Sequence, residues 1–171
     1  VAIEKEPENT AASVNLGTAL QRLGRHKEAI TAYETALRQE PSNLGAMTNL
    51  GVALQETGQI EDSLAILKCA AALAPHDPGV RTDLAVTMLK AGDIDGAEDA
   101  LNKAIASDST YGRAWSNLGN LLQSRLKLAE ARMAHESALT IDRDDPDFHW
   151  NHAITLLLGG DLQKGFAEYE W

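Results

Sequence analysis

Large apolar residues and small residues recur along the chain with one fixed spacing of 34 residues. The large series consists of Leu20, Leu54, Met88, Leu122 and Leu156. One small series consists of Ala2, Ala36, Ala70, Ala104 and Ala138. If each 34-residue block is numbered from Thr10, Leu44, Pro78, Gly112 and Pro146, its apolar positions 4, 7, 8 and 11 share one side of an ideal α-helix. No segment alternates between apolar and polar residues as a strand does. The pattern therefore predicts an all-α repeat protein.

Glycine and proline divide each block into two helices. Numbering runs from 1 to 34 and starts at Thr10, Leu44, Pro78, Gly112 and Pro146. Position 15, where a left-handed residue can end a helix, is occupied by Gly24, Gly58, Gly92, Leu126 and Gly160. Proline at position 32 stops the second helix in the early blocks. We expect helices over roughly positions 1–14 and 17–31, with a less sharp turn at Leu126.

The repeat divides the chain into four complete blocks and two incomplete ones. The complete blocks are 10–43, 44–77, 78–111 and 112–145, and a partial fifth covers 146–171. Residues 1–9 match the tail of a preceding block, because Ala2 and Pro7 fall at positions 27 and 32. Neither end has the polar capping helix of a free-standing array. We therefore expect a piece of a longer protein, with a further region after Trp171.

These motifs resemble the tetratricopeptide repeat (TPR) family along the whole chain. The fourth block contains its Trp-x-x-Leu-Gly signature at Trp115, Leu118 and Gly119. The first block supplies the later signature residues Ala29, Tyr33, Ala36 and Pro41. The resemblance implies a right-handed superhelix, or α-solenoid, of antiparallel helix pairs whose concave groove binds a polypeptide. Departures from the family pattern occur at Leu126, Ser109, Arg143 and His152.

Asparagine recurs on the side of the first helices opposite the apolar stripe. Position 6 is occupied by Asn15, Asn49, Asp83, Asn117 and Asn151. Asparagine within a helix costs roughly half a kcal/mol relative to alanine, so its repeated use suggests a gain elsewhere. Its amide donates and accepts, and could pair with the backbone of an extended peptide. This resembles the asparagine ladder of O-linked N-acetylglucosamine transferase; the alternative is that these side chains simply face water.

Other candidate groove residues come from positions 2, 5 and 9. They are Thr18, Val52, Val86, Asn120, Arg113 and Trp150. Chaperone-binding members of the family grip a C-terminal carboxylate with basic residues at positions 2, 5 and 6. Only Arg113 is basic at those positions here. We therefore expect a small, largely neutral groove without a carboxylate clamp.

The charge balance narrows the classes of partner. The chain carries 25 acidic and 15 basic residues, and its net charge is −10. This balance argues against nucleic acid and against an anionic membrane surface as partners. No apolar run approaches the roughly 18 residues of a membrane span. The single Cys69 excludes an internal disulfide and a multi-cysteine metal site, so the sequence fits a cytoplasmic protein.

The sequence contains no set of residues with the pattern of a catalytic site. His135, His149 and His152 could approach one another and form a zinc site. They occupy core positions of the repeat, however, so partly buried, hydrogen-bonded histidines are the better interpretation. We expect no metal, no cofactor and no catalytic residue in these blocks, while the activity of a full-length protein stays open.

Five of the eight aromatic residues lie in the last 24 residues: Phe148, Trp150, Phe166, Tyr169 and Trp171. The segment 159–171 resembles the end of repeat arrays that precede a glycosyltransferase-type domain in bacterial proteins. The resemblance implies an acceptor-recognition domain of a bacterial protein glycosyltransferase, for an acceptor such as flagellin. The alternative is a scaffold or assembly adaptor without a linked enzyme, including one that associates with itself. The aromatic residues alone could also simply close the core.

Overall fold

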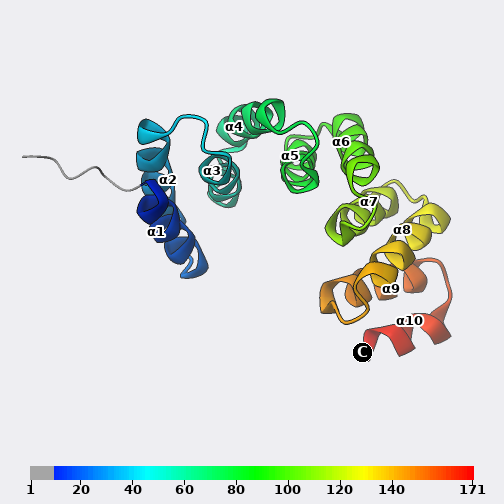
Figure 1. Ribbon diagram of the computed structural model, residues 1–171. Coiled ribbons are helices and arrows are strands. Elements are labelled where there is room, and N and C mark those ends of the chain that lie inside the picture. The colour runs from blue at the N-terminus through cyan, green and yellow to red at the C-terminus, as the bar shows by residue number, and fades with distance from the viewer. Residues whose placement is uncertain (1–9) are drawn as a thin grey trace, which may run out of the picture. The chain divides into compact units, whose positions relative to one another are not determined.

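The computed structural model describes residues 10–171, and over that range the chain forms ten α-helices (Figure 1). The first helices of the blocks are α1 (Thr10–Arg22), α3 (Leu44–Glu56), α5 (Pro78–Lys90), α7 (Gly112–Ser124) and α9 (Pro146–Leu158). The second helices are α2 (His26–Gln39), α4 (Ile60–Leu73), α6 (Ile94–Ser107), α8 (Leu128–Ile141) and α10 (Leu162–Tyr169). Every first helix begins at position 1 and every second helix at position 17, which confirms the predicted helix pairs. The predicted tail of a preceding block lies outside the described residues.

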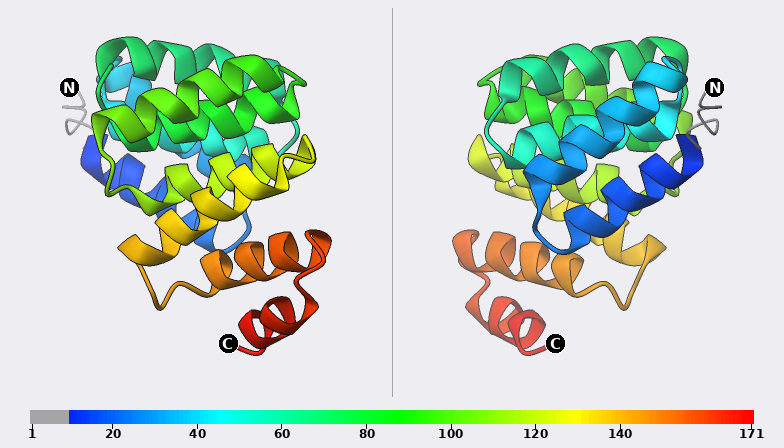
Figure 2. Two further views of the ribbon diagram at one scale, coloured as in Figure 1. Left: turned by 90° about the vertical axis from the view of Figure 1, so that its right-hand side faces the viewer. Right: turned by 90° about the vertical axis from the view of Figure 1, so that its left-hand side faces the viewer.

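The chain divides into two compact units, of which the first ends at Pro75 and the second begins at His76. Helices α1 to α4 belong to the first unit and α5 to α10 to the second. Within each unit, a first helix packs against its own second helix and against the second helix of the preceding block. Figure 2 shows the end of the second unit, where α10 in red lies against α9. Each unit thus builds its core between successive helix pairs.

Polar side chains cap the first helices α3, α5 and α9 at their block boundaries. The side chain of Asn43 accepts a hydrogen bond from the Ala46 backbone N–H at 2.9 Å, which caps α3. Asp77 caps α5 in the same way, and Pro78 follows it at the first helical position. Proline suits this position because its missing N–H would have no partner there. The chain therefore stops one block and starts the next within a few residues.

In the first four blocks, a small residue on the first helix makes room for a large, buried residue on the second helix. A Cβ added to Gly17 would lie 2.5 Å from Cε1 of Tyr33, which is far shorter than real contacts of this kind. A Cβ added to Gly51 would lie 2.5 Å from Cγ of Leu67. Both Tyr33 and Leu67 are fully buried. The size of the residue at position 8 therefore sets how closely the two helices approach.

The fourth block has the same turn as the others although leucine replaces its glycine. Leu126 has a φ of 59°, and the four turn glycines have φ values between 72° and 83°. The backbone N–H of Lys127 donates to the carbonyl of Leu122 at 3.0 Å, as the corresponding residue does in the first block. The prediction of a less sharp turn is wrong, because the packing of α7 against α8 and these hydrogen bonds hold Leu126 in the left-handed region.

His135 is a polar residue within the apolar core of the second unit. It is completely buried on α8 in the space left by Gly119. Neither ring nitrogen has a hydrogen-bond partner among the described residues. Burial, together with the nearby His152, lowers the pKa of His135 from 6.5 to about 4. The expectation that all three histidines would be hydrogen-bonded is therefore wrong for His135.

We predict that Leu126→Gly stabilises the protein by about 1 kcal/mol. A left-handed conformation strains a residue that has a Cβ by roughly 1–2 kcal/mol, and glycine removes that strain. Glycine also increases the entropy of the unfolded chain, which lowers the gain by about 0.4–1 kcal/mol. The Leu126 side chain is 80% exposed, so its removal sacrifices little apolar burial. Urea denaturation measures the difference. Leu126→Ala keeps the Cβ and should give no comparable gain, and equal gains in both variants would contradict the strain at this turn.

We predict that His135→Leu raises the free energy of unfolding at pH 7 by about 1–3 kcal/mol, since it removes buried polar atoms that lack partners. Leucine already fills the same repeat position at Leu67 and Leu101. Because the pKa is lower in the folded protein, the unfolded chain takes up a proton first as the pH falls. Stability should therefore fall between pH 6.5 and about 4, and less so in the variant. His76→Leu, at an exposed histidine, is the control, and equal pH dependence in both variants would contradict the assignment.

Candidate partner-binding site

The predicted groove residues lie on first helices that contact one another within each unit. In the first unit α1 contacts α3, and in the second unit α7 contacts both α5 and α9. Side chains on the same side of neighbouring first helices can therefore reach each other. The second unit offers three such helices in succession, and the first unit offers two.

The first helices of the second unit enclose a hollow of about 430 Å³, which we call the groove hollow. Five predicted groove residues line it: Val86, Arg113, Asn117, Trp150 and Asn151. The other lining residues are Ser116, Asp145, Asp147 and Phe148. The structure thus brings together predicted residues from α5, α7 and α9. Asn120 is exposed on α7 and does not line this hollow.

The two aspartates of the groove hollow were missed as groove residues by the sequence analysis. Asp145 caps α9, and its Oδ1 accepts hydrogen bonds from the backbone N–H groups of Asp147 at 2.9 Å and Phe148 at 3.2 Å. Asp147 occupies position 2 of its block, the position that Arg113 holds in the preceding one. The repeat register therefore carried the signal for Asp147, although an acidic residue there fits no carboxylate clamp.

The basic residue of the groove hollow is paired. The Arg113 guanidinium lies 2.6 Å from Oδ1 of Asp83 on α5. Burial raises the pKa of Asp83, and Arg113 only partly offsets that rise. Burial works against the charge on Arg113, but attraction and hydrogen bonding to Asp83 and Tyr111 together outweigh burial and raise the Arg113 pKa. Asp83 thus offsets the charge of Arg113 within the protein.

Two of the position-6 asparagines join neighbouring repeats. The Asn151 amide donates to Oγ of Ser116 at 3.1 Å, and the Asn49 amide donates to Oγ1 of Thr18 at 3.5 Å. A carboxamide has two N–H donors and two acceptor lone pairs, so one such bond leaves capacity for a ligand. These side chains therefore do more than face water. Their pairing with a peptide backbone remains a prediction.

In the first unit, the predicted groove residues are Asn15, Thr18, Asn49 and Val52. The Tyr33 hydroxyl lies 3.4 Å from Oγ1 of Thr18. The Thr18 hydroxyl therefore contacts both Tyr33 and Asn49. Val52 is half-buried, and Asn15 is exposed. The Thr18 hydroxyl is thus already used within the protein.

The remaining two histidines are hydrogen-bonded, as the sequence analysis expected. Nδ1 of His149 lies 2.7 Å from Oε1 of Glu168, and Nδ1 of His152 lies 3.1 Å from the same oxygen. Burial raises the pKa of Glu168, but hydrogen bonds from His152 and His149 outweigh burial and lower it. Between residues 10 and 171, no group of three metal-ligating side chains is placed to hold a metal ion. The contacts of these histidines instead attach α10 to α9.

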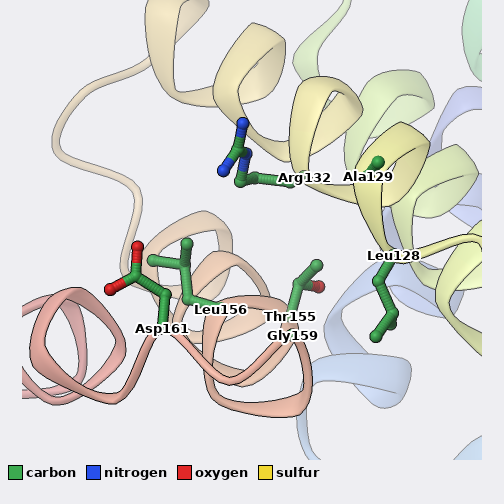
Figure 3. Close-up of a pocket in the computed structure, with 7 residues that line it drawn as sticks. All are labelled: Leu128, Ala129, Arg132, Thr155, Leu156, Gly159 and Asp161. Atoms are coloured by element: carbon green, nitrogen blue, oxygen red, sulfur yellow. The ribbon is translucent and has the colours of Figure 1, made fainter.

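A second hollow of about 290 Å³ lies in the same unit, where α8 faces the end of α9 and the turn that follows (Figure 3). Its lining residues are Leu128, Ala129, Arg132, Thr155, Leu156, Gly159 and Asp161. Leu156 and Thr155 are buried, and the Thr155 hydroxyl lies 2.6 Å from Oε1 of Gln123. None of the predicted groove residues lines it. We assign this hollow to the packing between successive helix pairs.

None of the helices between residues 10 and 171 combines the length and the apolar character that a membrane crossing requires.

Family models described as tetratricopeptide repeat match residues 2–43, 14–78 and 58–122. Among solved structures, the thermophilic TPR protein TTC0263 of Thermus thermophilus is 22% identical with a TM-score of 0.86, covering 95% of this chain and 89% of that one. Pseudomonas aeruginosa PilF is 21% identical with a TM-score of 0.84, and the match covers 94% of this chain and 73% of PilF. MamA from Desulfovibrio magneticus RS-1 is 17% identical with a TM-score of 0.74, and the match covers 95% of this chain and 92% of the MamA chain. At these identities the structures show a shared fold alone.

A search of curated proteins gives no match. The family matches extend over most of the chain, and the helix pairs of the structure keep the same period beyond them to residue 169. The chain therefore belongs to the tetratricopeptide repeat family, whose members bind protein partners, and it is a protein-interaction module of that family.

Proposed function

We propose that the second unit binds an extended segment of a partner polypeptide in the groove hollow. The observation that supports this most is the convergence of five predicted groove residues from three successive first helices around one hollow. Its volume of about 430 Å³ lies in the range of known ligand sites and is sufficient for a few side chains. The partner would thus be held by a short stretch of its chain.

Trp150 is the principal apolar contact that this hollow offers. Its side chain is 51% exposed, although it is one of the largest apolar groups in the unit. Tryptophan is over-represented among the residues that contribute most to protein interfaces, because it buries a large area at a small cost in side-chain entropy. The half-buried Asn117 beside it supplies a donor and an acceptor for a peptide backbone. Together these residues combine apolar burial with backbone pairing.

A scaffold or assembly adaptor is the function that needs the fewest further assumptions, since it requires only this groove. The narrower alternative is acceptor recognition beside a bacterial protein glycosyltransferase, and it depends on the segment 159–171. Two glycines of that segment have ordinary repeat roles. Gly160 forms the turn at a φ of 83°, and a Cβ on Gly165 would lie 2.6 Å from Cδ2 of Leu157. These roles weaken the segment as a signature of a linked enzyme.

The gene sequence after the codon for Trp171 tests the narrower alternative. A following region with the alternating strand and helix pattern of a glycosyltransferase would support acceptor recognition. A following region that contains only further helices would contradict it and would leave the adaptor.

We predict that Trp150→Ala and Asn117→Ala weaken binding of peptides selected on the unaltered chain from a displayed library of short random peptides. The loss should reach about tenfold or more for Trp150→Ala, as for residues at the centre of an interface. Fluorescence anisotropy with labelled peptides measures the affinity, and circular dichroism checks that the helices persist.

Two matched controls lie outside the groove hollow. Phe166→Ala removes another exposed aromatic residue of the same unit, and Asn120→Ala removes an exposed amide from the same helix as Asn117. Both controls should bind like the unaltered chain. Equal losses in all four variants, or none in any, would contradict the assignment of the groove hollow.

A further inference from the structure

We infer that the segment bound in the groove hollow carries a basic side chain, lysine or arginine, which lies against Trp150 and beside Asp147. This inference depends on the function proposed above, because it specifies the chemistry of a ligand for the same hollow. It is supported by the charge of the hollow, by the placement of Trp150 and Asp147 on one helix face, and by the pairing of Arg113.

The groove hollow has an excess of negative charge. Among the described residues, Asp145 and Asp147 line it, and Arg113 is its one basic lining residue. Since Arg113 is paired with Asp83, its charge is already offset within the protein. The N-terminus of α9 contributes roughly half a positive charge, which is less than the charge of the two aspartates. A cationic side chain is therefore favoured there, and an acidic side chain or a C-terminal carboxylate is disfavoured.

Trp150 and Asp147 lie three residues apart on α9, so they share one face of that helix. The Trp150 ring contacts the Tyr169 ring, with centroids 5.0 Å apart and planes inclined at 42°. The indole of tryptophan attracts a cation within about 6 Å of the ring, and among the aromatic side chains it does so most strongly. One ammonium or guanidinium group could therefore contact the ring face and the Asp147 carboxylate at the same time.

Asp145 and Asp147 have different roles in this site. One oxygen of Asp145 caps α9 through two backbone hydrogen bonds, so substitution of Asp145 would also disturb the helix start. Asp147 is exposed at the second residue of the helix and lines the hollow. Asp144 is exposed in the same turn but does not line the hollow. Comparing substitutions of Asp147 and Asp144 therefore distinguishes a local contact in the hollow from the general attraction of a chain with net charge −10.

The test uses the full chain and a displayed library of short random peptides, followed by synthetic copies of the enriched sequences. Lysine or arginine should be enriched at one fixed place in the peptides, and its replacement by glutamine should weaken binding. Asp147→Asn should weaken binding of the basic peptides about fivefold, near the upper end for a partly exposed ion pair. Asp144→Asn should leave their affinity unchanged, and the difference between the variants should shrink as salt screens the charges.

The outcomes distinguish this inference from the proposed function. Enriched peptides that are neutral or acidic, yet lose affinity in Trp150→Ala, would overturn the inference and leave the function. Equal losses in Asp144→Asn and Asp147→Asn would also overturn it, because the attraction would then be a general effect of charge. If no peptide is enriched, or if enriched peptides bind Trp150→Ala unchanged, both the inference and the proposed function fail.

Discussion

Close contact between the two helices of each block is the constraint on which the rest of the structure depends. In the first four blocks a glycine or alanine at position 8 leaves space that a large residue at position 24 fills, as Gly51 does for Leu67. Because protein interiors are packed at the density of organic crystals, a methyl group added to Gly17, Gly51 or Gly119 would collide with the side chain that fills this space. Within each unit the next first helix packs against this pair, so its polar side lies beside that of the preceding first helix. The placement of the groove residues thus follows from contacts on the opposite side of the same helices.

The period of the fold was predictable because each block repeats the same kinds of residue at the same positions. Small, large and turn residues all recur at 34-residue intervals, and the starts of the ten helices between residues 10 and 171 follow from that register. The turn at Leu126 was not predicted, since the preference for glycine is a local term of about 1 kcal/mol that packing on both sides can override. His135 was also misjudged. A core position in a repeat specifies size and burial, but it does not guarantee a hydrogen-bond partner.

The candidate site was predictable in part. Helix geometry placed Asn117, Trp150 and Asn151 on one side, and the structure places them around one hollow. Sequence alone could not show that Arg113 is paired with Asp83, because that contact joins residues 30 apart on different helices. It also could not show that Asp145 reaches the hollow while capping a helix. Such contacts depend on the angle between helices, which no pattern along one helix encodes.

The hydrogen bond from Asn151 to Ser116 has a consequence for recognition. A guest backbone that takes the N–H bonded to Ser116 must displace the serine hydroxyl, so one hydrogen bond is exchanged for another, whereas the second N–H of the Asn151 amide stays available. Such an exchange changes the free energy little, since the number of hydrogen bonds stays the same. The position-6 asparagines would then fix the alignment of a bound peptide and add little to its residence time. A module built in this way could release a guest quickly and still hold it in a single register.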